Sequence, residues 1–233
     1  MSILAKTGSN QRIRLMYQEG VTSLEAQAAE AGINSFLFEA DLTFQIKIER
    51  LGVFRNKGYI EDIHGTLVPH ESVDYYVDVG RDASIVESYL NGQAMVNALA
   101  EHPDRKGGLC WDVVVVREPM HWTSTSTRSI IGLGPRHGAL ITVAYHRLVS
   151  RNDEELGRRI KLLLMHELGH ALGLFLGPFS DTMTDKQIQA LHCQNLCVMR
   201  SGGPERLNAL IIRPFCHSCR ALLRVNCSAY TKK

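Results

Sequence analysis

The segment NDEELGRRIKLLLMHELGHALG, residues 152–173, constrains the fold more than any other part of the chain. Asn152 is a residue type that caps helix starts, and acidic residues fill the first turn, where they favour the helix dipole. Gly173 supplies a stop signal at the other end. The pattern therefore predicts one long helix that ends at Gly173, a residue able to turn the chain back in a left-handed conformation.

The same helix carries a metal-binding motif near its end. His166 and His170 are four residues apart, which places both rings on one helix face, where they can share one metal ion. Zinc accepts neutral imidazole ligands, and water activated by zinc needs a base close by. Glu167 occupies that place and is the predicted general base. Catalytic zinc usually takes a third protein ligand, and the residues alone leave three candidates, Asp181, Asp185 and His192.

A second metal site is predicted from cysteine spacing. Two close pairs occur near the C-terminus, Cys193 with Cys197 and Cys216 with Cys219. Four cysteines grouped in two short pairs are typical of a structural zinc site with four thiolate ligands.

Composition excludes several classes of protein. The 233 residues are 45% hydrophobic and 21% charged, which is ordinary for a globular domain. A net charge of +2 disfavours nucleic acid or an anionic membrane as partner. Neither a signal-peptide core nor a transmembrane-length apolar run is present, so a cytosolic protein is expected. In that reducing compartment Cys110 and Cys227, which lie outside the two pairs, are expected to be free thiols.

The rest of the chain alternates between strand and helix patterns, which predicts an α/β layer architecture. Helices are expected at 24–32 and 84–102, and strands at 42–54, 73–80, 111–120 and 139–148. After residue 173 the residue pattern is typical of loops, and a short helix is expected from Asp185. We therefore predict an N-terminal subdomain, 1–173, that includes the histidine helix, and a C-terminal subdomain, 174–233.

The combination HELGHALG (166–173), HC (192–193), CVM (197–199) and CHSC (216–219) resembles the archaemetzincins, a family of metzincin-clan zinc peptidases. The resemblance spans roughly residues 84–224. It implies a metzincin-like mixed twisted sheet with a backing helix, an active-site helix and a small zinc-stabilised C-terminal region. It also implies site roles: His166, His170 and His192 as catalytic zinc ligands, Glu167 as general base, Cys193, Cys197, Cys216 and Cys219 as structural zinc ligands, and Met199 as the Met-turn. Residues 127–133 would form an edge strand that pairs with extended peptide.

Two departures from the family pattern stand out. The family places its third histidine at the position of Leu176, whereas the candidate here is His192. An insertion between Gly173 and His192, covering 174–191, accounts for the difference, and such insertions in surface loops cost little closure entropy. The first cysteine pair also has three intervening residues where the family usually has four.

The sequence therefore predicts a cytosolic zinc metallopeptidase with two zinc ions, one catalytic and one structural. Its partner would be a peptide or protein substrate, without nucleic acid or membrane. The alternative is a non-catalytic, zinc-stabilised binding protein, a former peptidase whose insertion has spoiled the site. The intact glutamate of the HExxH motif favours the enzyme, because a purely structural metal has no use for a general base.

Overall fold

The computed structural model describes residues 11–43, 45–52, 59–61, 67–69, 73–101, 110–123, 126–135, 138–174, 192–200 and 214–231. Its central feature is a five-stranded sheet in the order β2-β1-β6-β10-β9. Four of these strands run parallel, and only the last, β9, is antiparallel to its neighbour. The sheet is therefore mixed, as predicted. Its strands are β1 (Arg12–Tyr17), β2 (Lys47–Gly52), β6 (Cys110–Val116), β9 (Gly132–Leu133) and β10 (Gly138–Thr142).

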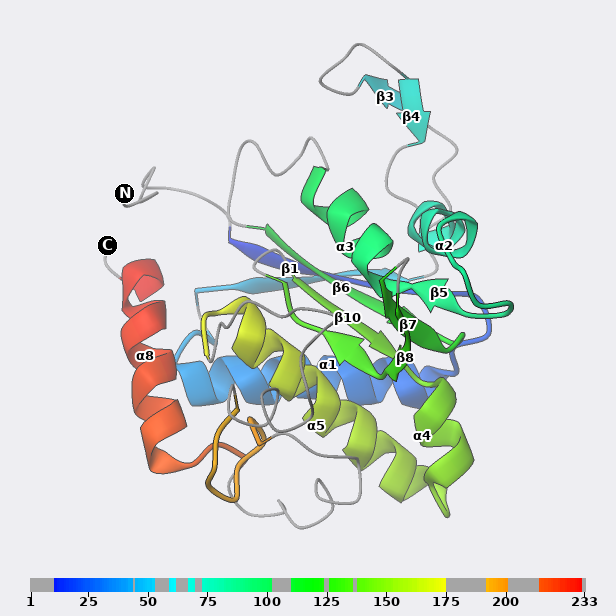
Figure 1. Cartoon of the computed structure of the whole chain (residues 1–233). Helices are drawn as coiled ribbons and strands as arrows, with labels where there is room; N and C mark the ends of the chain where they lie inside the picture. Colours follow the sequence, from blue (N-terminus) through cyan, green and yellow to red (C-terminus); the bar gives the residue numbers. More distant parts are fainter. Residues whose placement is uncertain are drawn as a thin grey trace.

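Helices cover both faces of this sheet (Figure 1). One face carries α1 (Ser23–Ala40) and α5 (Asp153–Ala171), which lie side by side. The other carries α2 (Val73–Asp82) and α3 (Gly92–Glu101). Strand β6 lies in the middle of the sheet, and its valines alternate between the two cores: Val113 and Val115 pack toward α1 and α5, Val114 and Val116 toward α2 and α3. This explains the continuous β-branched run, because a strand buried on both faces has no polar side.

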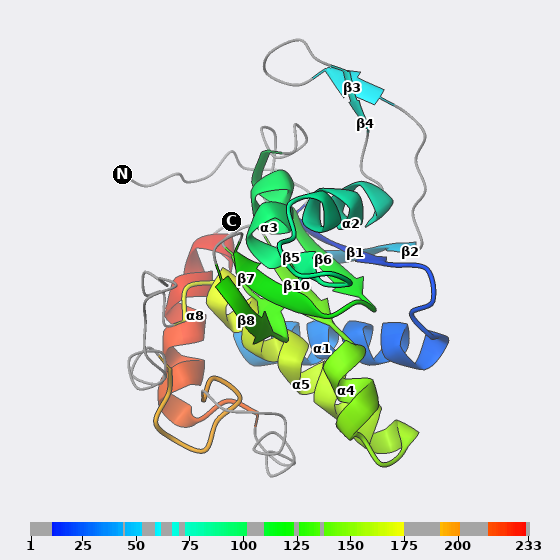
Figure 2. The ribbon, with the colours of Figure 1, turned by 45° about the vertical axis from the view of Figure 1, so that its right-hand side comes forward.

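Smaller elements complete the described part of the chain. A three-stranded sheet has the order β5-β7-β8, from β5 (Leu90–Asn91), β7 (Met120–Thr123) and β8 (Ser126–Ile130). A separate hairpin pairs β3 (Tyr59–Glu61) with β4 (Leu67–Pro69). Helix α4 (Ala144–Val149) leads into α5, and α8 (His217–Thr231) lies beside the main body, as Figure 2 shows from a second side.

Helix α1 is longer than predicted, because Gly32 does not end it. A side chain at this position would place its first carbon 2.9 Å from the Lys161 carbonyl oxygen and 3.2 Å from Leu164 Cβ. Gly32 therefore permits close packing of α1 on α5. The helix instead ends at Asp41, which adopts a left-handed conformation with φ of 62°.

The predicted strand 73–80 is wrong, since these residues form the start of α2. Its buried residues, Val73, Tyr76, Val77 and Gly80, recur at helical spacing, and this period overrides the β-propensity of the valines and tyrosines. Three other predictions hold in part. Residues 42–54 contain β2, 84–102 contain β5 and α3, and 139–148 split into β10 and α4.

Two further expectations concern the C-terminal part of the chain. The division at residue 173 stays a prediction, although buried residues from α8 and from 193–199 belong to the same core as α1 and α5. The short helix from Asp185 lies outside the described residues. None of the helices in the described ranges is long and apolar enough to cross a membrane.

Candidate metal centre

Helix α5 forms as predicted and positions two of the three histidines. Asn152 is its N-cap and accepts a hydrogen bond from the Glu155 amide at 2.9 Å. The helix ends at Ala171, and Gly173 then takes a φ of 89°, the left-handed turn expected of it. This turn brings the Leu174 amide within 2.8 Å of the Gly169 carbonyl oxygen. The chain therefore folds back beside the last helical turn instead of continuing along its axis.

The two α5 histidines have the geometry of metal ligands. His166 Nδ1 lies 2.7 Å from the Val198 carbonyl oxygen, and His170 Nδ1 lies 3.0 Å from the Leu174 carbonyl oxygen. Because a carbonyl only accepts hydrogen bonds, each Nδ1 must donate, and a neutral imidazole then has its lone pair on Nε2. The two Nε2 atoms face each other at 3.0 Å. Two lone pairs so placed repel unless a cation lies between them, so this donor arrangement fits a metal ion.

His192 completes a three-histidine cluster with His166 and His170, whose ligand atoms all lie within 4.8 Å of one another. Its ring stacks on that of His166, with centroids 5.3 Å apart, and meets the ring of His170 edge-on at 5.1 Å. Of the three third-ligand candidates, the structure thus brings His192 to the α5 pair. Asp181, Asp185 and most of the expected insertion lie outside the described residues.

Glu167 lies on α5 between the two histidines and is 6% exposed. Burial raises the pKa of its carboxyl to about 8. Strand β9 passes directly over it: a side chain at Gly132 would place its first carbon 2.5 Å from Glu167 Oε1, and one at Gly134 would reach 2.0 Å from the Glu167 carbonyl oxygen. These two glycines let the strand backbone approach the helix, a requirement signalled in the sequence only by the pattern GLG.

The expected edge strand at 127–133 is divided between two sheets. Residues 126–130 form β8, which pairs with β7 in the small sheet. Residues 132–133 form β9, which ends the order of the main sheet. The division follows from Ile131, whose carbonyl accepts a hydrogen bond from the Thr142 amide as the chain crosses from one sheet to the other. The edge strand next to Glu167 is therefore the short β9.

Met199 is fully buried against the histidine helix. A side chain at Gly169 would place its first carbon 2.4 Å from Met199 Sδ and 3.0 Å from its Cε. Gly169 stands between His166 and His170 on α5, so the thioether occupies the space below the three-histidine cluster. The Met-turn role that the family resemblance implies for Met199 stays a prediction.

The four paired cysteines also come together, with all four sulfurs within 4.8 Å of one another. The Cys193 and Cys216 sulfurs are 3.7 Å apart, too far for a disulfide. Tetrahedral zinc with Zn–S bonds of about 2.3 Å requires sulfurs separated by about 3.8 Å. The cluster therefore has the dimensions of a four-thiolate zinc site.

One thiol of this cluster, that of Cys197, is shifted toward the thiolate form. A hydrogen bond from Cys219 lowers the pKa of the Cys197 thiol to about 6, and the Cys216 amide donates to the same sulfur at 3.3 Å. The pKa of Cys219 is raised correspondingly, because its proton is held by Cys197. Cys227 lies outside the cluster as a free, buried cysteine, as predicted, and burial raises its pKa to about 12. The side chain of Cys110 lies outside the described residues.

The chain was compared with known protein families, protein sequences and solved structures. No protein-family model matches the chain, and no curated protein sequence matches it. Among solved structures it is similar to archaemetzincin from Methanopyrus kandleri, with a TM-score of 0.59 and 20% identity over 97% of this chain and 99% of the other. A zinc-dependent peptidase from Methanocorpusculum labreanum also matches, with a TM-score of 0.46 and 18% identity over 91% of this chain and 99% of that one.

The molecule is thus a mixed α/β protein that carries a three-histidine cluster and a four-cysteine cluster, each able to hold a metal ion. Its fold is that of the archaemetzincins, so the resemblance read from the sequence is confirmed at the level of the fold.

Proposed function

We propose that this protein is a zinc metallopeptidase, with His166, His170 and His192 as ligands of a catalytic zinc ion. The observation that carries the proposal is the pair of Nε2 atoms that face each other at 3.0 Å, with both Nδ1 atoms bound to backbone carbonyls. A structural metal would need no adjacent buried carboxylate, yet Glu167 lies directly between the two ligands in the sequence and at the edge strand in space.

Zinc at this position would polarise a substrate carbonyl and make water a better nucleophile at neutral pH. The chain's own residues supply the remaining parts. Glu167 would accept the proton of the attacking water and return it to the leaving amine. The carbonyl groups of Val198 and Leu174 hold the histidine rings in the tautomer that leaves Nε2 free to bind metal. Met199 packs against Gly169, in the helix turn between the two α5 histidines.

The substrate would be an extended peptide that lies along β9. An open strand edge binds a peptide backbone through main-chain hydrogen bonds, independent of the side chains in the peptide. Because Gly132 packs on the Glu167 carboxylate, a peptide added beside β9 would run past the general base. This arrangement favours hydrolysis of peptide bonds over reactions of small molecules.

A second zinc ion would be held by Cys193, Cys197, Cys216 and Cys219 and would be structural. Four sulfur ligands leave no open position for water, which excludes a direct role in hydrolysis. The alternative function, a binding protein without catalysis, would keep the fold and this cysteine site but would not depend on the carboxylate of Glu167.

Glu167→Gln separates the two functions. The zinc-loaded variant should retain zinc, by elemental analysis, and lose at least about 100-fold in the rate of cleaving a mixed peptide library. Glu154→Gln is the matched control, since Glu154 is exposed near the start of the same helix, and it should cleave at the wild-type rate. Cleavage by Glu167→Gln at that rate would reject Glu167 as the general base. If the zinc-loaded wild type cleaves no member of the library, the binding-protein alternative gains support.

A further inference from the structure

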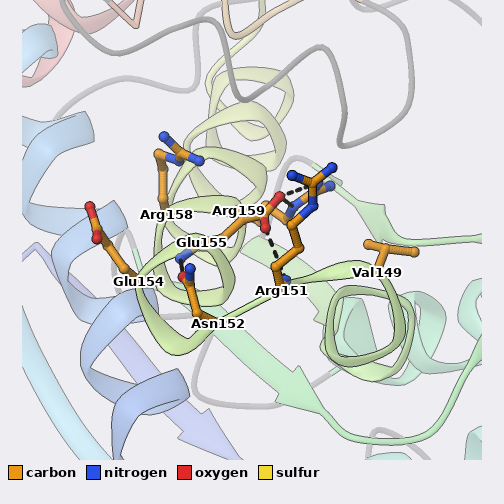
Figure 3. A pocket seen from close by; sticks show the side chains of 7 residues that line it. All are labelled: Val149, Arg151, Asn152, Glu154, Glu155, Arg158 and Arg159. Carbon is orange, nitrogen blue, oxygen red and sulfur yellow. Dashed lines mark hydrogen bonds and ion pairs between the residues drawn. The ribbon is translucent and has the colours of Figure 1, made fainter.

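A polar cavity of about 550 Å³ opens at the start of α5, the end of the helix opposite His166 (Figure 3). The proposed peptidase mechanism makes no use of it. Its lining contains three arginines and two glutamates, contributed by the α4–α5 junction and the first turns of α5: Val149, Arg151, Asn152, Glu154, Glu155, Arg158 and Arg159.

Both carboxylate oxygens of Glu155 accept hydrogen bonds from other lining residues. Its Oε1 accepts hydrogen bonds from Arg159 Nε at 3.0 Å and from Arg159 Nη2 at 2.6 Å. Its Oε2 accepts from the Arg151 backbone amide at 2.9 Å. These three bonds fix the position of the carboxylate. Glu155 therefore pairs with the guanidinium of Arg159, whereas its bond to Arg151 is to the backbone amide of that residue and not to its guanidinium.

Arg159 itself retains a donor with no acceptor. The residue is only 3% exposed, and its Nη1 has no hydrogen-bond partner within the described ranges. A buried donor without an acceptor destabilises the folded protein, and more so when the donor is charged. Ser150 Oγ is a second buried polar atom without a partner in the same part of the molecule, and Ser150 stands between the lining residues Val149 and Arg151. Both groups can donate to an acceptor that the described protein atoms do not provide.

The net charge of the lining residues indicates that the missing acceptor carries a negative charge. Three guanidinium groups face two carboxylates, which leaves one positive charge in excess in the lining. The N-terminus of α5 adds the partial positive charge of a long helix. Figure 3 shows Arg151 on one side of the helix start and Arg158 with Glu154 on the other, and the guanidinium of Arg159 lies against Glu155.

We propose that this cavity binds a small molecule through an oxyanion, a carboxylate or a phosphate group, held by Arg159 Nη1 and the Arg151 guanidinium. Guanidinium groups form the strongest hydrogen bonds with such anions. The volume exceeds that of a bare anion and lies in the range of small-molecule sites, about 300–1,000 Å³. The ligand is therefore an organic anion, and its charged group is the part that the structure identifies.

The test measures binding of inorganic phosphate and of acetate to the zinc-loaded full chain by titration calorimetry, at constant ionic strength maintained with chloride. Arg151→Gln removes one cation of the site. It should keep the wild-type melting temperature, because Arg151 is exposed. Arg224→Gln makes the same change of charge at an exposed position of α8, away from the cavity.

The proposal expects at least one of the two anions to bind the wild type, with affinity lowered tenfold or more in Arg151→Gln and unchanged within twofold in Arg224→Gln. Binding of phosphate alone identifies a phosphorylated ligand, and binding of acetate alone identifies a carboxylate. Equal affinities in the wild type and Arg151→Gln would overturn the proposal, since an anion on the zinc ion or on the general surface would behave in this way. So would the absence of binding above the chloride background.

Discussion

Met199 lies so close to Gly169 that a side chain at residue 169 would place its first carbon 2.4 Å from the methionine sulfur. This contact joins the loop 192–200 to the helix turn between His166 and His170. The loop therefore supplies three parts of the histidine site: the His192 ring, the Val198 carbonyl that binds His166, and the thioether below.

Gly169→Ala should destabilise the protein by about 1–3 kcal/mol, because the added methyl group must displace Met199 in a packed core. The matched control is Gly157→Ala on the same helix, where the nearest atom to a new Cβ is Ala28 Cβ at 3.8 Å. That change should stabilise by roughly 0.5–1 kcal/mol through helix propensity alone. Urea unfolding of both variants tests the pair, and stabilisation of both would show that Met199 does not constrain Gly169.

Removing the cysteine site should also weaken the histidine site. His192 directly precedes Cys193, and the Val198 carbonyl that binds His166 directly follows Cys197. Cys216→Ser with Cys219→Ser should therefore lose one zinc ion by elemental analysis and lower the melting temperature. It should also reduce zinc affinity at the remaining site.

Cys227→Ser is the control for that experiment, because Cys227 is a buried cysteine outside the cluster. It should keep both zinc ions even if it melts at a lower temperature. A cysteine double variant that keeps two zinc ions and the wild-type melting temperature would contradict the four-cysteine assignment.

His192→Ala should lower the affinity of the catalytic site by more than about 100-fold, since loss of a ligand exceeds the 10–100-fold effect of losing a supporting group. Asp181→Ala and Asp185→Ala should change it far less, because the ligand atom of His192 lies within 4.8 Å of those of His166 and His170. Chelator competition on the three variants measures the difference. The largest loss in Asp181→Ala would reject His192 as the third ligand.

Stability in acid should depend on His146, which is buried on α4 with neither ring nitrogen hydrogen-bonded within the described residues. Burial, with a contribution from the nearby charge of Arg159, lowers the pKa of His146 to about 4. Between about pH 6.5 and 4 the unfolded chain binds a proton at this residue that the folded chain does not. The folded state should therefore lose stability as the pH falls through this window, by about 2 kcal/mol at pH 5 relative to pH 7.5.

The check compares the wild type with His146→Leu by urea unfolding at pH 7.5 and at pH 5. Other titrating groups contribute equally to both proteins, so the difference between their losses isolates His146. The wild type should lose about 2 kcal/mol more than the variant. Identical losses would show that His146 titrates alike in the folded and unfolded chains.

Several parts of the molecule could be predicted from the sequence, because their local signals agree with one another. Helix α5 begins at its predicted cap and turns at Gly173, and β6 is the doubly buried strand that its valine run indicates. The histidine pair needed only helical spacing, which brings residues four apart onto one face. The cysteine pairs were recognisable because short spacings limit how far two ligands can separate.

The contacts between distant segments depend on the tertiary structure. The strand predicted at 73–80 is the start of a helix, because burial on one face, and not β-propensity, sets the period of its apolar residues. Three contacts join residues that are far apart in the chain. Gly132 and Gly134 approach Glu167, the Val198 carbonyl binds His166, and Met199 packs against Gly169. In the sequence, these contacts are marked only by small residues, or not at all where the contact is made by a backbone carbonyl, which every residue has. Their positions follow from how the sheet, the helix and the loop pack, because close packing admits one arrangement of these elements and local propensity encodes none of it.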